Sequence, residues 1–85
     1  MKALVSMSFK TSLMIAEKHF RATGVKSVWL DKDGEEVYIV NSMHNARAIL
    51  FTSVYVGDGF KDRDDWVDIM DMLTRCGAKL FEITT

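Results

Sequence analysis

The side chains with the most potential for chemistry are aspartates that gather between residues 58 and 65. Gly57-Asp-Gly59 interrupts the preceding apolar run, and Asp62, Asp64 and Asp65 follow closely. Such carboxylates could surround a divalent cation, but negative side chains are also favoured at the start of a helix, where N–H groups lack partners. We therefore interpret this cluster as an acidic helix start and an acidic contact patch, and we expect no metal there; the patch comprises Asp58, Asp62, Asp64 and Asp65.

The histidines and the cysteine do not form a recognisable catalytic set. His19 stands beside Phe20 in a helical pattern, and no serine or cysteine is spaced to act as its nucleophile. Cys76 stands at the expected end of a helix, and we interpret it as a small buried apolar residue. A single cysteine provides no disulfide framework and favours a reducing, cytoplasmic setting. We expect a protein that is not an enzyme, with no cofactor and no small-molecule substrate.

The strongest structural signal lies between residues 25 and 41. Asp33-Gly34 between alternating apolar residues predicts a β-hairpin with a two-residue type I′ turn. This turn places Trp29 opposite Tyr38. Because the turn fixes the register, it also assigns the two faces of the hairpin: Val28, Leu30, Val37 and Ile39 on one, and Ser27, Trp29, Tyr38 and Val40 on the other.

Periodicity and capping residues predict the remaining elements. A strand is expected over residues 2–7, and a helix over Phe9–Thr23, closed by Gly24. A strand is expected over about Ala48–Val56, with a helix over residues 45–54 as the alternative. A second helix should start at Asp62 as its cap, bury Trp66, Ile69, Met70 and Leu73, and end before Gly77. A final strand is expected over Ala78–Thr84.

The order β-α-β-β-(β)-α-β predicts one domain over residues 1–85 with a ferredoxin-like α+β sandwich. Both helices should then cover one face of a mainly antiparallel sheet. The other face should stay open and expose aromatic side chains, which favour interfaces. We predict that this face binds a protein partner or a second copy of the chain, as in a regulator, adaptor or inhibitor, through Trp29, Tyr38, Val40, Phe51 and Tyr55.

A nucleic acid is the alternative partner. RNA-recognition domains stack bases on aromatic side chains of a sheet, and Arg47-Ala-Ile-Leu-Phe51 resembles the RNA-contacting strand of that family. The resemblance implies a binder of single-stranded RNA or DNA that stacks bases on Trp29, Tyr38 and Phe51. Residues 1–30, with five basic side chains against one acidic, would follow the backbone. The net charge of −1 gives no overall attraction to nucleic acid or membrane, and no apolar stretch approaches a membrane-spanning length.

Overall fold

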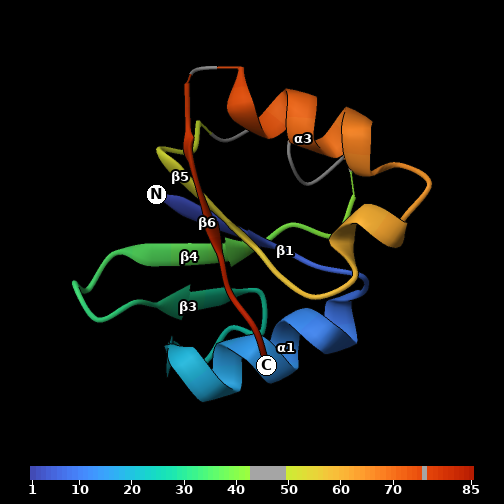
Figure 1. Cartoon of the computed structure of the whole chain (residues 1–85). Coiled ribbons are helices and arrows are strands. Elements are labelled where there is room, and N and C mark those ends of the chain that lie inside the picture. Colours follow the sequence, from blue (N-terminus) through green and yellow to red (C-terminus); the bar gives the residue numbers. More distant parts are fainter. Residues whose placement is uncertain (43–49, 76) are drawn as a thin grey trace.

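The central strand of the protein is β1, Lys2–Val5, which pairs in parallel with a strand on either side. The computed structural model describes residues 1–42, 50–75 and 77–85. Within these ranges, six strands form one mixed sheet in the order β2-β3-β4-β1-β5-β6 (Figure 1). Their bounds are Arg21–Ala22 for β2, Val28–Leu30 for β3, Glu36–Ile39 for β4, Ser53–Val56 for β5 and Lys79–Glu82 for β6.

Two helices among the described residues cover opposite faces of this sheet. Helix α1, Phe9–His19, packs with Ile15 and Ala16 on Leu4 and Val37. Helix α3, Trp66–Thr74, packs with Ile69 and Leu73 on the other face, against side chains that include Ala3, Val5 and Val54. Figure 1 shows the sheet between the two helices.

The chain is therefore an α+β protein, but the predicted placement of both helices on one face is wrong. Right-handed crossovers put their helices on opposite faces when they step in opposite directions along the sheet. Here the connection through α1 leads from β1 to β4 on one side, whereas α3 leads from β5 to β6 on the other. The predicted mainly antiparallel character is matched only in part. Strand β3 pairs antiparallel with β2 and β4, whereas β1 with β4, β1 with β5 and β5 with β6 pair in parallel.

Helix α1 begins as the sequence predicts and ends earlier. The Ser8 hydroxyl caps it by accepting a hydrogen bond from the Thr11 backbone N–H at 3.1 Å. The helix ends at His19 instead of Thr23, because Arg21–Ala22 adopt extended backbone and pair with β3 as strand β2. Gly24 has a φ of 93° but lies in the loop after this strand, so it does not close the helix.

Helix α3 begins later than predicted. Asp62 does not cap it, because it lies in a separate 3-10 turn, η1, Phe60–Asp62. The residue before the helix is Asp65, whose side chain binds Arg63 and makes no capping hydrogen bond. The buried stripe of Ile69 and Leu73 is confirmed, whereas Trp66 and Met70 are partly buried against the same cluster.

The predicted strand over residues 48–56 is confirmed in part. Its last four residues form β5, so the alternative helix is wrong for Ser53 and Val54. Residues 43–49 lie outside the described part of the chain, and so do most of the Arg47–Phe51 segment and the histidine at position 44. The final strand is shorter than predicted, at Lys79–Glu82. The cysteine at position 76 also lies outside the described residues.

The β3–β4 hairpin forms, but its register differs by one residue from the predicted one. Trp29 pairs with Val37, and Val28 with Tyr38. The loop has three residues, Lys32–Gly34, and is closed by hydrogen bonds between the backbones of Asp31 and Glu35 and of Gly34 and Asp31. Only Gly34 has positive φ in this loop, at 79°, which contradicts a type I′ turn and fits a turn followed by a bulge.

This shift reverses the predicted position of Trp29. The side chain lies under α1 with Leu4, Val37 and Ile39 and is 9% exposed. Val28 and Leu30, which were predicted to share a face with Val37 and Ile39, are only half-buried. A change of one residue in register moves a whole strand face to the other side of the sheet. Trp29 is therefore part of the core.

The two helices carry opposite charge. Exposed basic side chains on and after α1 include Lys10, Lys18 and Arg21, with Glu17 opposing them. On and before α3, Asp64, Asp68 and Asp71 are exposed, with Lys61 and Arg75 opposing them; Arg75 pairs with Asp71 at 3.8 Å. Because the helices lie on opposite faces, the uneven charge along the sequence becomes a basic side and an acidic side of the sheet.

The core position of Trp29 makes a first prediction. Trp29→Ala should lower the free energy of unfolding by about 3–5 kcal/mol, as for other buried aromatic side chains. Val25→Ala, at a neighbouring position that is 56% exposed, should change it by less than about 0.5 kcal/mol. Urea denaturation measures both values. Small and equal effects of the two substitutions on the free energy of unfolding would contradict the core position of Trp29.

The hairpin loop makes a second prediction. A Cβ at Gly34 would meet no atom within 4 Å, so only the positive φ opposes a substitution. Gly34→Ala should therefore cost about 1–2 kcal/mol, and Gly34→Asn should cost less, because asparagine tolerates this conformation. Thermal or urea unfolding of the two variants checks the order, and an asparagine variant less stable than the alanine one would contradict this loop geometry.

Candidate interaction site

The aromatic residues predicted to share one open face lie on both sides of the sheet. Trp29 and Tyr55 pack on the α1 side. Tyr38, Val40 and Phe51 pack on the α3 side, where Val40 and Phe51 are 2% and 3% exposed. A helix packs on each side, so among the described residues these side chains do not form one open aromatic face.

Trp29 still reaches the edge of one cavity. The cavity has a volume of about 370 Å³ and lies between α1 and the loop before β3, with Leu13, Val25 and Trp29 among its lining residues. The indole N–H, however, donates to the Lys26 carbonyl at 2.8 Å. The polar atom of the side chain is therefore satisfied within the chain and is not offered to a partner.

The acidic residues predicted as one patch have separate surroundings. Asp58 accepts a hydrogen bond from the Thr85 hydroxyl at 2.9 Å. Asp62 lies in η1, and Asp64 is exposed before α3. Asp65 forms an ion pair with Arg63 at 2.9 Å. Two of the four carboxylates are thus engaged within the chain.

Arg63 joins the carboxyl ends of two neighbouring strands. Its guanidinium donates to the Ser6 carbonyl after β1 at 3.4 Å and to the Asn41 carbonyl after β4 at 2.6 Å, while Asp65 holds its other edge. The carboxyl ends of parallel strands are where open α/β sheets bind ligands. In this protein an internal arginine occupies part of that region.

The glycines of Gly57-Asp-Gly59 serve close packing at the same end of the sheet. A Cβ on Gly57 would lie 2.5 Å from the Ile15 side chain, and a Cβ on Gly59 would lie 2.8 Å from Met7. Gly59 also has a φ of 74°. Tight contact with the loop after β1 and with α1 accounts for both glycines.

At the opposite end of the sheet, Lys2 and Asp31 form a largely buried ion pair. The Lys2 ammonium lies 2.5 Å from the Asp31 carboxylate, with Glu35 at 3.4 Å. The hydrogen bond to Asp31 raises the pKa of Lys2 and outweighs the opposing effect of burial. Lys2 therefore stays protonated and is no nucleophile.

One surface that remains open among the described residues is the outer edge of β6. This strand ends the sheet, and all four of its residues are exposed. Leu80 and Phe81 are 54% and 46% exposed, although Phe81 also contacts Tyr55 with 5.9 Å between ring centroids. An edge that combines apolar side chains with unpaired backbone groups can pair with another strand.

The hydrogen bonds to β5 show which backbone groups of β6 are free. The Lys79 N–H donates to Thr52, and the Ile83 N–H donates to Val56. Along a strand, alternate residues direct both their N–H and C=O groups to the same side. The backbone groups of Leu80 and Glu82 therefore point outward. The next outward carbonyl, that of Thr84, lies 2.6 Å from the His19 ring nitrogen, so α1 closes the free edge there.

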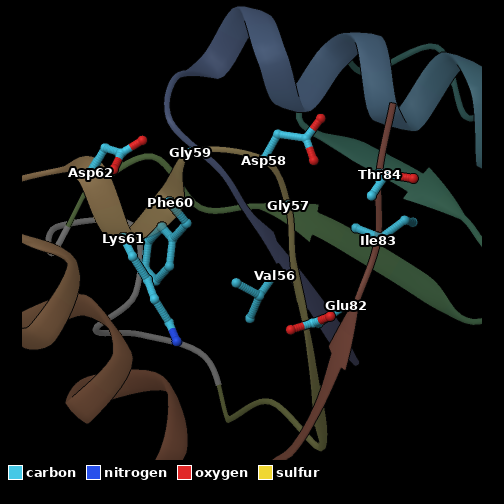
Figure 2. A pocket seen from close by; sticks show the side chains of 10 residues that line it. All are labelled: Val56, Gly57, Asp58, Gly59, Phe60, Lys61, Asp62, Glu82, Ile83 and Thr84. Atoms are coloured by element: carbon cyan, nitrogen blue, oxygen red, sulfur yellow. The ribbon is translucent and has the colours of Figure 1, made fainter.

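A cavity adjoins the carboxyl end of this edge. It has a volume of about 330 Å³ and is lined by the segment from Val56 to Asp62 and by Glu82, Ile83 and Thr84. Figure 2 shows Lys61 and Glu82 extending toward the space beside Val56 from opposite sides, whereas Asp62 points away. Glu82 belongs to both the edge strand and the cavity lining, so the cavity borders the carboxyl end of β6.

Among the described residues, no three His, Cys, Asp or Glu side chains are placed to hold a metal ion. Within the same residues, no helix is long and apolar enough to cross a membrane. The sequence predicted β6 but not its importance, because a strand's place at the edge of a sheet depends on the topology and leaves little trace in its residues.

Comparisons with protein-family models, curated proteins and solved structures found no match.

The buried ion pair gives a pH-dependent prediction. Burial raises the pKa of Asp31, but the Lys2 ammonium and the backbone N–H groups of Asp33 and Glu35 outweigh it, so the pKa is lowered overall. A lowered carboxyl pKa stabilises the fold above the pKa of an unfolded aspartate, about 4, and this contribution is lost as pH falls through the folded value. Asp31→Asn should therefore cost roughly 1.5–3 kcal/mol at neutral pH and should remove part of the acid sensitivity.

Asp33 supplies the matched control for this prediction. Its carboxylate is 70% exposed and lies 3.9 Å from Lys2, so Asp33→Asn should change the free energy of unfolding by less than about 1 kcal/mol. Urea unfolding from pH 3 to pH 7 measures both variants. A wild-type acid transition that persists unchanged in Asp31→Asn would rule out this role for Asp31.

Proposed function

We propose that the protein is a small, non-enzymatic interaction module, a regulator, adaptor or inhibitor, that binds an extended segment of a protein partner along β6. The observation that carries the proposal is the free edge of this strand, where Leu80 and Phe81 are half exposed and the backbone groups of Leu80 and Glu82 point outward. Strand addition of this kind gains affinity from main-chain hydrogen bonds and specificity from alternate side chains.

The other edge of the sheet is a weaker candidate for the same role. Strand β2 has only two residues, Arg21 and Ala22. A short, charged edge is a recognised protection against pairing with other chains. Strand β6 is twice as long and has two apolar residues at its centre, between Lys79 and Glu82.

A protein partner is favoured over nucleic acid because of where the aromatic side chains lie. The nucleic-acid alternative required Trp29, Tyr38 and Phe51 to form a common stacking surface. Trp29 packs under α1, and the other two pack against the α3 cluster, with 6.4 Å between their ring centroids. Base stacking needs exposed ring faces, and these rings are used to stabilise the core.

The proposal predicts that blocking the outward N–H of Leu80 abolishes partner binding without unfolding the protein. Proline is tolerated on an edge strand where its missing N–H would face solvent. Leu80→Pro should therefore keep the hydrogen bonds from β6 to β5 and remove one outward N–H donor from the free edge. Wild-type and variant proteins, immobilised and exposed to nuclease-treated extract of the native host, should differ in the proteins that they retain.

Three control variants separate backbone from side-chain and folding effects. Leu80→Ala keeps the N–H and should retain more partner than Leu80→Pro. Glu82→Pro blocks the second outward N–H and should reproduce the loss if Leu80→Pro is poorly folded. Lys79→Pro removes the donor to Thr52 and should destabilise the fold. Undiminished capture by the folded Leu80→Pro and Glu82→Pro variants would refute strand addition at β6.

A further inference from the structure

We infer that the partner of β6 is a second copy of the chain, paired antiparallel about a two-fold axis normal to the sheet and centred on Phe81. This inference rests on the proposed use of β6 as a pairing edge. It names both the occupant and the register, and the outward backbone groups of the strand determine which registers are possible.

A two-fold axis of this kind allows only a few registers. In an antiparallel pair, residues that face each other with their backbone groups exchange both hydrogen bonds. The backbone groups of Leu80 and Glu82 point outward, whereas those of Lys79, Phe81 and Ile83 point toward β5. Each outward residue must therefore face an outward residue of the second copy.

Of these registers, the one centred on Phe81 uses the edge best. It places Leu80 opposite Glu82 of the other copy twice, which gives four main-chain hydrogen bonds. Centring on Glu82 would set two carboxylates directly opposite each other, and like charges in this position are destabilising. Centring on Leu80 would pair Glu82 with Ala78, which lies outside the strand.

The Phe81 register also joins two rows of aromatic rings. On the α1 side, Phe20 contacts Tyr55 with 5.2 Å between ring centroids, and Tyr55 contacts Phe81 at 5.9 Å. At the centre of the pair, Phe81 and its symmetry mate form a non-hydrogen-bonded pair, the arrangement in which facing side chains approach most closely. The row then continues through the interface, and the exposed part of Phe81 becomes covered.

The symmetry of this contact limits the assembly to two copies. A contact between identical edges closes on itself, whereas a contact between β6 of one copy and β2 of the next would continue into a fibre. Because β2 is short and carries Arg21, it is a poor partner for β6. The assembly expected is therefore a closed dimer with one continuous sheet.

Amide exchange in the wild-type protein tests the edge without any mutation. Sedimentation should show a monomer–dimer equilibrium, and the backbone N–H groups of Leu80 and Glu82 should become protected as the concentration rises. A monomer at all concentrations, or a dimer in which these two amides exchange freely, would overturn the inference. Capture experiments with Leu80→Pro test separately whether β6 binds other proteins. The absence of this dimer would therefore not by itself contradict the proposed function.

Disulfide formation tests the register. The Phe81→Cys variant should form a disulfide that joins position 81 of both copies under mild oxidation, because facing residues of a non-hydrogen-bonded pair have close Cβ atoms. Mass spectrometry of the linked peptides identifies the bond with the native cysteine at position 76 still present. Leu80→Cys alone should form no link between copies at position 80, but a mixture of Leu80→Cys and Glu82→Cys proteins should form a mixed one. Efficient self-linking of the Leu80→Cys variant at position 80, in place of these links, would refute the Phe81 register.

Discussion

The arrangement of the sheet depends on the hydrogen bonds of the Asp31 carboxylate. One oxygen accepts hydrogen bonds from the backbone N–H groups of Asp33 and Glu35, which holds the hairpin loop at three residues. The other binds the Lys2 ammonium and ties the loop to β1. The length of the loop fixes the register of the hairpin, and the register places Trp29 under α1. The buried tryptophan is in turn part of the apolar cluster on which α1 packs.

The second constraint is the burial of β1 on every side. Its two neighbours pair with it in parallel, and its side chains alternate between the two core clusters, Leu4 toward α1 and Ala3 and Val5 toward α3. Parallel strands need helices on their faces, because crossover connections put them there. Once both faces are covered, an approaching strand can reach only the edges of the sheet. The exposure of Leu80 and Phe81 is thus a consequence of the topology.

Much of the local structure could be predicted from the sequence, but the three-dimensional arrangement could not. The helix start at Phe9, the buried positions Ile69 and Leu73 of α3, and the hairpin between Val28 and Ile39 all depend on neighbouring residues, and these predictions are confirmed. Asp33-Gly34 favours a two-residue turn locally. The competing hydrogen bonds from the Asp33 and Glu35 N–H groups to the Asp31 carboxylate are also local, and only the bond from Lys2 involves a distant residue. The direction of the second crossover, which decides whether one face stays open, likewise depends on how β5 and β6 are placed beside β1. The aromatic face was therefore predicted from a correct hairpin with the wrong register.

The opposite charges of the two helices have an electrical consequence for the whole molecule. Lys10, Lys18 and Arg21 lie on one side of the sheet, and Asp64, Asp68 and Asp71 lie on the other, so the protein has a dipole moment directed across the sheet. This moment persists at the isoelectric point, near pH 6.0, where the net charge vanishes. In a pair related by a two-fold axis normal to the sheet, the components along the axis add instead of cancelling. Such a dimer would be a plate with one cationic and one anionic surface, able to orient in an electric field and to adsorb on charged supports of either sign.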